Sequence, residues 1–270
     1  MERPEWLVSD IDLDRPSASR VYDYLLGGSH NIQADRDFAE QMLELAPEAA
    51  EAAHANRAFL RRAVQSLVDD GIRQFLDIGS GIPTRGNVHE VAHRLAPESR
   101  VVYVDIDPIA VAHGNQLLRA LPKTASIQGD LRKPEAILEH PTTRAILDFG
   151  EPVGVLLVAV LHFIPDEQDP GGAVARFRAA VPSGSQLVIS HAAWPAEVSP
   201  AMLKARDAYD QTRTSLILRT AEDIAACFAD WPLKSPGIVT VANWRPDERA
   251  AESSERTDRL PALAAVGVKP

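Results

Sequence analysis

Cysteine is almost absent from this chain of 270 residues, which contains only Cys227. A single thiol excludes an internal disulfide framework, a cysteine-based zinc site and an iron–sulfur cluster. Its scarcity fits a reducing compartment. The rest of the composition, 45% hydrophobic and 24% charged residues, is that of an ordinary globular protein. A chain of this length can bury a core large enough to be stable without a disulfide.

Long hydrophobic runs are also missing. The longest lies within residues 153–164 and is interrupted by His162, whereas a membrane helix needs about 20 apolar residues. The first ten residues, MERPEWLVSD, have mixed charges and no apolar centre, so we expect no signal peptide. These absences predict a soluble, cytoplasmic protein that does not enter a membrane.

Basic residues are outnumbered by acidic ones. The chain has 28 Lys and Arg against 38 Asp and Glu, a net charge of -10. Non-specific binding to nucleic acid depends on clustered cations that neutralise phosphates. The acidic excess therefore argues against a nucleic-acid partner, although it is compatible with a local basic patch.

Apolar residues follow two different patterns along the chain. The first seventy residues show only helical spacing, as in residues 20–26 and 60–68. Short apolar runs then alternate with helical patterns, and the run 153–160 is apolar at nearly every position, as in a strand buried on both faces. The strand candidates are residues 73–78, 101–104, 125–128, 153–160, 186–190, 238–241 and 262–268. This alternation predicts an α/β protein with a doubly wound, mostly parallel sheet.

The same patterns divide the chain into two parts. We expect residues 1–70 to form an N-terminal arm and a helical cap, and residues 71–270 to form the sheet domain. A mostly helical insertion at about 193–219 interrupts the alternation.

Acidic residues end three successive predicted strands. Asp77 lies in the first strand, Asp105 ends the second, and Asp130 follows the third. Each alone could cap a helix or lie in a solvated loop. Because the carboxyl ends of parallel strands meet at one edge of the sheet, where ligands bind, the three together indicate a ligand site. The turn Gly79-Ser80-Gly81 after the first strand would let the backbone approach that ligand closely.

This turn differs from the dinucleotide fingerprint. G-x-G-x-x-G needs a third glycine, where this chain has Thr84, and Pro83 removes an amide that could bind phosphate. Asp77 would also repel a pyrophosphate. A cationic nucleoside without phosphate, such as S-adenosylmethionine, suits these residues better. We expect Asp77 near its ammonium group, Asp105 on the ribose hydroxyls and Asp130 at the adenine amino group.

Five segments carry a resemblance to a known family. They are RVYDYLLGGSHNIQADR (20–36), FLDIGSGIPTRGNVHEVA (75–92), VVYVDIDPIAVAH (101–113), VLLVAVLHFIPD (155–166) and GIVTVANWRPD (237–247). Together they are similar to the actinobacterial "S-adenosyl methyltransferase" family, a former domain of unknown function within the class I S-adenosylmethionine-dependent methyltransferases. The resemblance runs from about residue 10 to the end. It implies a seven-stranded Rossmann-like sheet with the last strand antiparallel, and an N-terminal helical cap.

The resemblance also assigns residues to the cofactor. The first motif corresponds to Asp77, Gly79, Ser80 and Gly81, with Thr84 beyond it; Asp105 is the ribose-binding acid, Ile106 lies beside the adenine, and Asp130 and Leu131 lie at the adenine edge. Pro83-Thr84 departs from the wider superfamily, which often has another glycine there, but matches the narrower family.

The N-terminal run of residues 22–31 contains Tyr22, Tyr24 and a glycine pair followed by Ser-His-Asn. It could be a lid over the cofactor, with Tyr22 as a contact, or merely packing tyrosines and a helix stop. The matching run in the family favours the lid. Tyr209, Arg206 and Arg213 in the insertion could line an acceptor pocket or form a solvated helix face.

Methyl transfer requires alignment of nucleophile, carbon and sulfur more than it requires a catalytic residue. A hydroxyl or ammonium nucleophile needs a base, whereas a thiolate or free amine does not. His162, just past the apolar strand, is the best candidate base, although it could equally cap that strand. His191 is placed similarly but less well. Neither belongs to a cluster with metal-ligand spacing, so we expect no metal.

These observations favour a methyltransferase that uses S-adenosylmethionine and a small-molecule acceptor. A non-catalytic protein that binds S-adenosylmethionine or S-adenosylhomocysteine is the alternative, because no residue is an unmistakable catalyst. An NAD-dependent oxidoreductase comes third, disfavoured by Asp77, Pro83 and Thr84.

Overall fold

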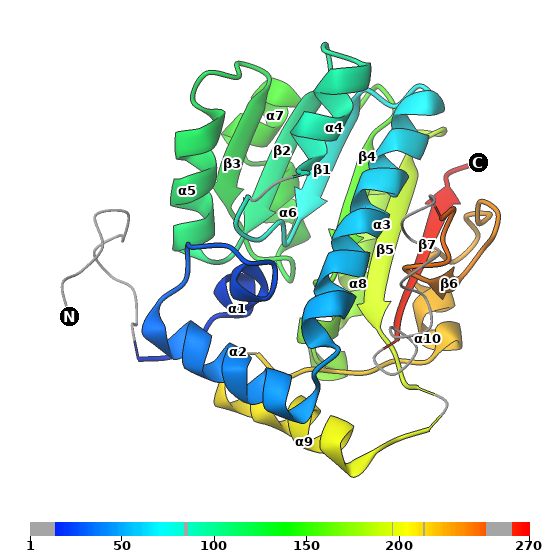
Figure 1. Ribbon diagram of the computed structural model, residues 1–270. Coiled ribbons are helices and arrows are strands. Elements are labelled where there is room, and N and C mark those ends of the chain that lie inside the picture. Colours follow the sequence, from blue (N-terminus) through cyan, green and yellow to red (C-terminus); the bar gives the residue numbers. More distant parts are fainter. Residues whose placement is uncertain (1–13, 84–85, 196, 213, 247–260) are drawn as a thin grey trace.

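The computed structural model describes residues 14–83, 86–195, 197–212, 214–246 and 261–270. Its centre is a seven-stranded sheet with helices on both faces (Figure 1). The strands are β1 (Gln74–Ile78), β2 (Arg100–Asp105), β3 (Thr124–Gln128), β4 (Gly154–Val158), β5 (Gln186–Ala192), β6 (Val239–Thr240) and β7 (Ala262–Val268).

The strand order is β3-β2-β1-β4-β5-β7-β6. Strands β1 to β5 pair in parallel, and β7 runs antiparallel to both β5 and β6. The chain returns from β3 at one edge to β4 beside β1, so the strand order reverses there, at the place where open parallel sheets bind ligands. The predicted α/β sheet, seven-stranded and mostly parallel with its last strand antiparallel, is confirmed.

Helices and short 3₁₀ turns connect the strands. They are α1 (Ala18–Leu25), α2 (Gln33–Leu45), α3 (Ala49–Asp69), α4 (Val88–Leu95), α5 (Pro108–Leu118), α6 (Pro134–Leu138), α7 (Pro141–Ile146), η1 (Leu161–Phe163), η2 (Asp166–Gln168), α8 (Pro170–Ala180), α9 (Pro200–Ala208), η3 (Tyr209–Gln211) and α10 (Ala221–Ala226). None of the described helices combines the length and apolarity that crossing a bilayer requires.

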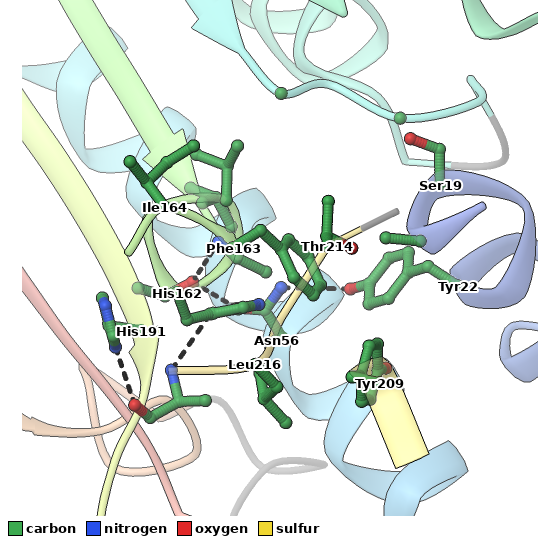
Figure 2. A pocket seen from close by; sticks show the side chains of 18 of the residues that line it. Ser19, Tyr22, Asn56, His162, Phe163, Ile164, His191, Tyr209, Thr214 and Leu216 are labelled. Carbon is green, nitrogen blue, oxygen red and sulfur yellow. Dashed lines mark hydrogen bonds between the residues drawn. The ribbon is translucent and has the colours of Figure 1, made fainter. Parts of the chain in front are cut away.

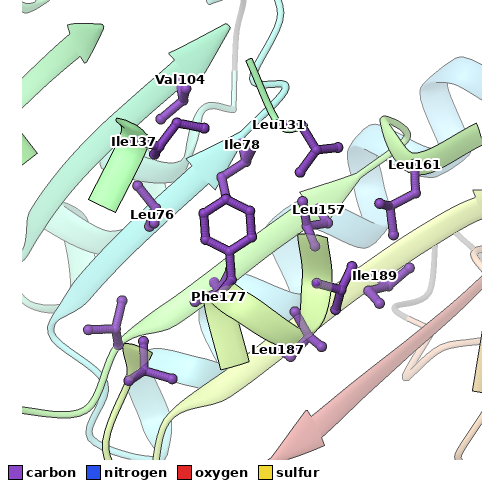
Figure 3. Packing of buried hydrophobic residues seen from close by; sticks show 14 of the residues in the cluster. Leu76, Ile78, Val104, Leu131, Ile137, Leu157, Leu161, Phe177, Leu187 and Ile189 are labelled. Atoms are coloured by element: carbon purple, nitrogen blue, oxygen red, sulfur yellow. The ribbon is translucent and has the colours of Figure 1, made fainter. Parts of the chain in front are cut away.

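Side-chain alternation along β1 creates a core on each face of the sheet. Phe75 packs with Phe59 of α3 on one face. Leu76 and Ile78 pack on the other face around Phe177 of α8 (Figure 3). Successive side chains of a strand point to opposite faces, so Asp77 lies on the same face as Phe75. This register turns its carboxyl group toward the side covered by α3.

The helices before β1 have two different roles. α3 lies on the sheet, where its apolar side belongs to the core. α1 and α2 lie instead at the carboxyl edge of the parallel strands and pack with α9 through Val21, Phe38 and Ala205 (Figure 1). We call α1, α2 and α9 the edge helices. The packing thus joins part of residues 1–70 to the insertion at 193–219, and leaves α3 with the sheet.

Two segments differ from their predicted secondary structure. β4 ends at Val158, before the predicted boundary at residue 160, because Ala159 turns out of the sheet with φ 57°. The apolar run continues because Val160 packs against the glycine turn after β1, where a Cβ on Gly79 would clash with it. Among the described residues of the insertion, the helices are α9 and η3, and residues 214–219 lie in no helix.

A buried ion network ties the edge helices to the sheet domain. Arg20 of α1 pairs with Asp35 of α2 (Nε–Oδ2 2.7 Å) and with Asp107 at the start of α5 (Nη1–Oδ2 3.0 Å). The side chains are at most 7% exposed. Asp107 also caps α5 by accepting from Ile109 N, and accepts from Ser17 Oγ at 2.6 Å. One guanidinium therefore bridges two buried carboxylates.

Replacing Arg20 should detach the edge helices. Arg20→Leu leaves the carboxylates of Asp35 and Asp107 buried without a cation, and breaking a buried pair typically costs about 3–5 kcal/mol. Hydrogen exchange should show faster opening of α1 and α2, while the strands keep their protection. The control is Arg176→Leu, which removes an exposed pair with Glu135 and should change stability by less than about 1 kcal/mol. Equal exchange in both variants would contradict the role of the network.

Candidate functional site

A cavity of about 720 Å³ lies at the carboxyl ends of the strands, between the sheet and the edge helices (Figure 2). It brings together every predicted site residue that the structure describes: Tyr22, Asp77, Gly79, Ser80, Gly81, Asp105, Ile106, Asp130, Leu131 and His162. Thr84 and Arg213 lie outside the described residues. The cavity therefore gathers residues from α1, the strand ends and η1 at one place.

The glycine turn is held against β2 and leaves open space on its other side. The amides of Gly79 and Ser80 both donate to Val104 O, at 2.8 and 3.1 Å. Gly79 has φ +72° and no room for a Cβ. Gly81 has φ +66°, and apart from its chain neighbours no described residue has an atom within 4 Å of where its Cβ would be. A ligand can therefore approach the backbone at Gly81 without meeting a side chain.

Asp77 differs from the other acids of the site in its lack of hydrogen bonds. Its side chain is buried on the α3 face of the sheet, where the residue is 4% exposed, and it has no hydrogen bond to any part of the chain that the structure describes. Burial raises the pKa of this carboxyl to about 7; Arg57 opposes the rise and Asp105 adds to it. A buried carboxylate that accepts no hydrogen bond is stabilised by any further cation that reaches it.

Arg57 is a site residue that the sequence analysis missed. It is 8% exposed on α3, lines the cavity, and donates from Nη2 to Asn87 Oδ1 at 2.8 Å. Its charge acts on Asp77. In the sequence it is one of several arginines in a helix, a pattern typical of a solvated face. One feature of the sequence does point to it: Asn56 and Arg57 fall on the same helical side as the apolar residues Ala53, Leu60 and Val64.

Asp105 is buried and already bonded. Its Oδ2 accepts from Gly81 N at 2.7 Å, and its Oδ1 accepts from Asp107 N at 2.8 Å and from Ser19 Oγ at 3.3 Å. Burial raises the pKa of Asp105 to about 6, against the lowering effect of the two amides. The weak bond from Ser19 of α1 is the contact that a ligand hydroxyl could most easily replace.

The third acid, Asp130, lies at the same edge but pairs with Arg132. Its carboxylate accepts from Arg132 Nε at 2.8 Å and Nη2 at 2.7 Å. Partial burial would raise the pKa of Asp130, but the bonds from Arg132 outweigh it and lower the pKa below its usual value. Nearby, Ile106 is 54% exposed while Leu131 is buried. The apolar surface of Ile106 is available to a planar ligand group; the predicted contact of Asp130 with adenine stays a prediction.

His162 is held by the neighbouring strand. Its Nδ1 accepts from Ala192 N at 3.2 Å, which places the hydrogen of the neutral ring on Nε2. Burial, His191 and Arg219 lower the pKa of His162 well below its usual value. The ring is therefore neutral and presents an N–H donor. Acting as a base would require the Nδ1 lone pair that Ala192 uses, so the predicted role as a base stays a prediction.

Behind His162 lies a chain of hydrogen bonds that starts at a buried cation. Arg219 Nη1 donates to His191 Nε2 at 2.8 Å, and His191 Nδ1 then donates to Ala192 O at 2.7 Å. Burial lowers the pKa of His191 to about 4. Both imidazoles are thus neutral at pH 7, with their tautomers set by the backbone of Ala192.

The N-terminal run is bound internally and to α3. Tyr22 Oη donates to Ala53 O and accepts from Asn56 Nδ2, both at 3.0 Å (Figure 2). Gly27, with φ +76°, ends α1, and the absence of a Cβ on Gly28 makes room for the carboxylate of Asp23. The glycine pair therefore acts as a helix stop in this structure. The lid stays a prediction.

Among the described residues, no group of three histidine, cysteine or acidic side chains could hold a metal ion. In the insertion, Tyr209 and Arg206 line the cavity, and Arg206 pairs with Asp207.

Comparisons with known proteins agree with this geometry. The model of the family described as S-adenosyl methyltransferase matches residues 4–270. The crystal structure of a candidate methyltransferase from Thermobifida fusca YX is 39% identical, with a TM-score of 0.89 and 96% of each chain covered. A DUF574 family protein from Streptomyces avermitilis MA-4680 is 38% identical, with a TM-score of 0.90, covering 96% of this chain and all of the other.

More distant structures share the fold. The geranyl diphosphate C-methyltransferase of Streptomyces coelicolor A3(2), solved with Mg²⁺, geranyl diphosphate and S-adenosyl-L-homocysteine, is 15% identical, with a TM-score of 0.50 over 77% of this chain and 80% of that one. A search of curated proteins finds no match. The family model spans nearly the whole chain and two solved relatives exceed 30% identity. The chain belongs to the S-adenosyl methyltransferase family and is an S-adenosylmethionine-dependent methyltransferase.

Proposed function

We propose that this enzyme binds S-adenosylmethionine along the strand ends and transfers its methyl group to a small molecule held between the cofactor and the edge helices. The observation that carries the proposal is the pair of buried, oppositely charged groups, Asp77 and Arg57, on the wall of one cavity. The methionine part of the cofactor is a zwitterion. Its ammonium group complements Asp77, and its carboxylate complements Arg57.

The remaining predicted contacts follow from the same placement. The ribose lies over Gly81, where the backbone is open, and its hydroxyls meet Asp105 in place of Ser19. The adenine covers the exposed side chain of Ile106, with Leu131 and Asp130 at its edge. A nucleoside in this position removes apolar surface from water and adds hydrogen bonds to a buried acid.

The protein's part in the reaction is to position the reactants and exclude water. The cofactor supplies an activated methyl group on a sulfonium. Residues of η1 and the edge helices line the cavity, where they would hold the acceptor beside the cofactor and limit its contact with solvent. The size of the cavity and its enclosure by α1, α2 and α9 support a small-molecule acceptor.

Cofactor affinity should depend on the ionisation of Asp77. Its pKa of about 7 means that the carboxyl is mostly protonated at pH 5.5. Only the carboxylate attracts the ligand's ammonium, so affinity for S-adenosylhomocysteine should rise about tenfold between pH 5.5 and 7. Calorimetry on the wild type and Asp77→Asn checks this. The variant should bind at least about tenfold more weakly at pH 7, with a much flatter pH profile; parallel profiles would contradict the assignment.

The same substitution should stabilise the protein when no cofactor is present. The pKa of Asp77 is higher in the folded state than in the unfolded chain, so stability is lost as the pH rises from about 4 toward 7. Asn has no charge to bury. Thermal unfolding at pH 8 should therefore give a higher midpoint for Asp77→Asn than for the wild type. A lower midpoint would mean that Asp77 has a partner in the free protein.

Replacing Asp105 tests the proposed contact with the ribose. Asp105→Ala removes charged hydrogen-bond acceptors and should weaken S-adenosylhomocysteine at least about tenfold, as expected for bonds to a charged group. The measurement is the rise in unfolding temperature with ligand concentration. Asp230→Ala, whose side chain is 80% exposed and pairs with Arg178, is the control and should behave as wild type. Undiminished binding by a folded Asp105→Ala variant, or a response to NADH alone, would overturn the proposed site.

A further inference from the structure

The charges that line the cavity are unevenly distributed. All of its carboxyl groups within the described residues, Asp77, Asp105, Asp107 and Asp130, lie at the strand ends. The other side, formed by the edge helices, η1 and the segment after η3, is apolar. It is lined by Leu25, Met42, Ala46, Phe163, Met202 and Leu216. The cation on that side, Arg206, pairs with Asp207. An acceptor bound there meets no carboxylate of a described residue that could balance a positive charge or take a proton.

Two polar groups on the apolar side have no partner in the part of the chain that is described. One is the hydroxyl of Tyr209. The ring of Tyr209 packs edge-on against Phe38, and its centroid lies 5.7 Å from that of the Phe163 ring. Burial raises the pKa of Tyr209 to about 12, so the hydroxyl keeps its proton. The other is Nε2 of His162, which carries the ring hydrogen because Nδ1 accepts from Ala192. Both residues line the cavity (Figure 2).

Other polar groups nearby are already satisfied. Tyr22 donates to Ala53 O, and Asn56 uses Nδ2 on Tyr22 and Oδ1 on Ser190. The hydroxyls of Thr214 and Ser215 are bonded to Thr212 and Asp210, so the unpaired donors among the described residues of this side are Tyr209 and His162. The series of hydrogen bonds from Arg219 through His191 ends at the carbonyl oxygen of Ala192, and the N–H of Ala192 donates to His162. This series places Arg219, which also pairs with Asp166 (Nη2–Oδ1 2.5 Å), behind the His162 donor. Hydrogen-bond donors that have no base beside them are complementary to an oxyanion.

We propose that the methyl acceptor is a largely apolar molecule that carries an acidic hydroxyl or carboxyl group and binds as the oxyanion, with Tyr209 and His162 on the cavity wall as its hydrogen-bond donors. This inference rests on the proposed function, since it places the acceptor beside the sulfonium. The oxyanion attacks the methyl carbon, the carbon–sulfur bond breaks, and its electron pair stays on sulfur. The products are the methyl ether or ester and neutral S-adenosylhomocysteine. No proton moves, so no catalytic base is needed.

The test uses 4-nitrophenol as a probe, because the absorption of its anion reports its ionisation. The protein is first saturated with S-adenosylhomocysteine, and that binding is measured separately. At matched concentration, 4-nitrophenolate should bind, and the apparent pKa of the bound phenol should fall below that of the free phenol. The cationic 4-nitrobenzylammonium and neutral nitrobenzene should bind at least fivefold more weakly.

Variants separate the two donors from general packing. Tyr209→Phe keeps the ring contacts and should weaken 4-nitrophenolate at least fivefold and reduce the pKa shift, and His162→Leu should do the same. Affinity for S-adenosylhomocysteine should stay as in the wild type. The control is Tyr24→Phe, because Tyr24 donates to the exposed Glu40 and is not on the cavity wall; it should change neither quantity.

Three results would overturn the inference: no binding of 4-nitrophenolate, equal or tighter binding of the cation or the neutral probe, or wild-type behaviour in both donor variants. If these occur while S-adenosylhomocysteine binds normally, the proposed function stands and only the acceptor class is wrong. Failure of S-adenosylhomocysteine to bind would overturn both.

Discussion

Desolvation of acidic side chains at the carboxyl edge of the sheet is the constraint on which the site depends. Asp107 is buried but has the guanidinium of Arg20, and Asp105 is buried but has two backbone amides. Asp77 is buried with no hydrogen bond to a described residue, and its pKa rises to about 7 as a result. A fold that leaves one acid in this state gives up stability in the free protein and recovers it when a cation binds there.

The edge helices share that constraint. Arg20 of α1 neutralises Asp107, Ser19 of α1 reaches Asp105, and Tyr22 of α1 bonds through Asn56 to β5. The helices over the cavity are therefore attached through the groups that surround the cofactor position. A ligand hydroxyl that replaces Ser19 would act on α1 directly. Cofactor binding and the arrangement of these helices are thereby linked through contacts that either one can alter.

The sheet and three of its acids could be predicted because both signals are local. Strand-end acids need only the strand pattern and the rule that parallel strands share an edge. Arg57 could not be found in this way, since its position opposite Asp77 depends on how α3 lies across the sheet. The apolar run at 153–160 overran β4 because Val160 packs against a glycine turn rather than in the strand. Likewise, nothing in the sequence around His162 shows that Ala192 occupies Nδ1.

The described carboxyl groups of the cavity lie at the strand ends, and the apolar side opposite them favours methyl transfer to an oxyanion. Methyl transfer from a sulfonium to an oxyanion joins a cation and an anion into neutral products, so water, which stabilises the separated charges, slows it. An apolar acceptor side removes that stabilisation. In the proposed arrangement, donors such as Tyr209 and His162 would return only part of that stabilisation to the acceptor oxygen. In the proposed arrangement, the carboxylates at the strand ends would hold the cofactor's ammonium and ribose without competing for the methyl group. The same uneven distribution can thus bind the donor tightly and leave the acceptor oxygen reactive.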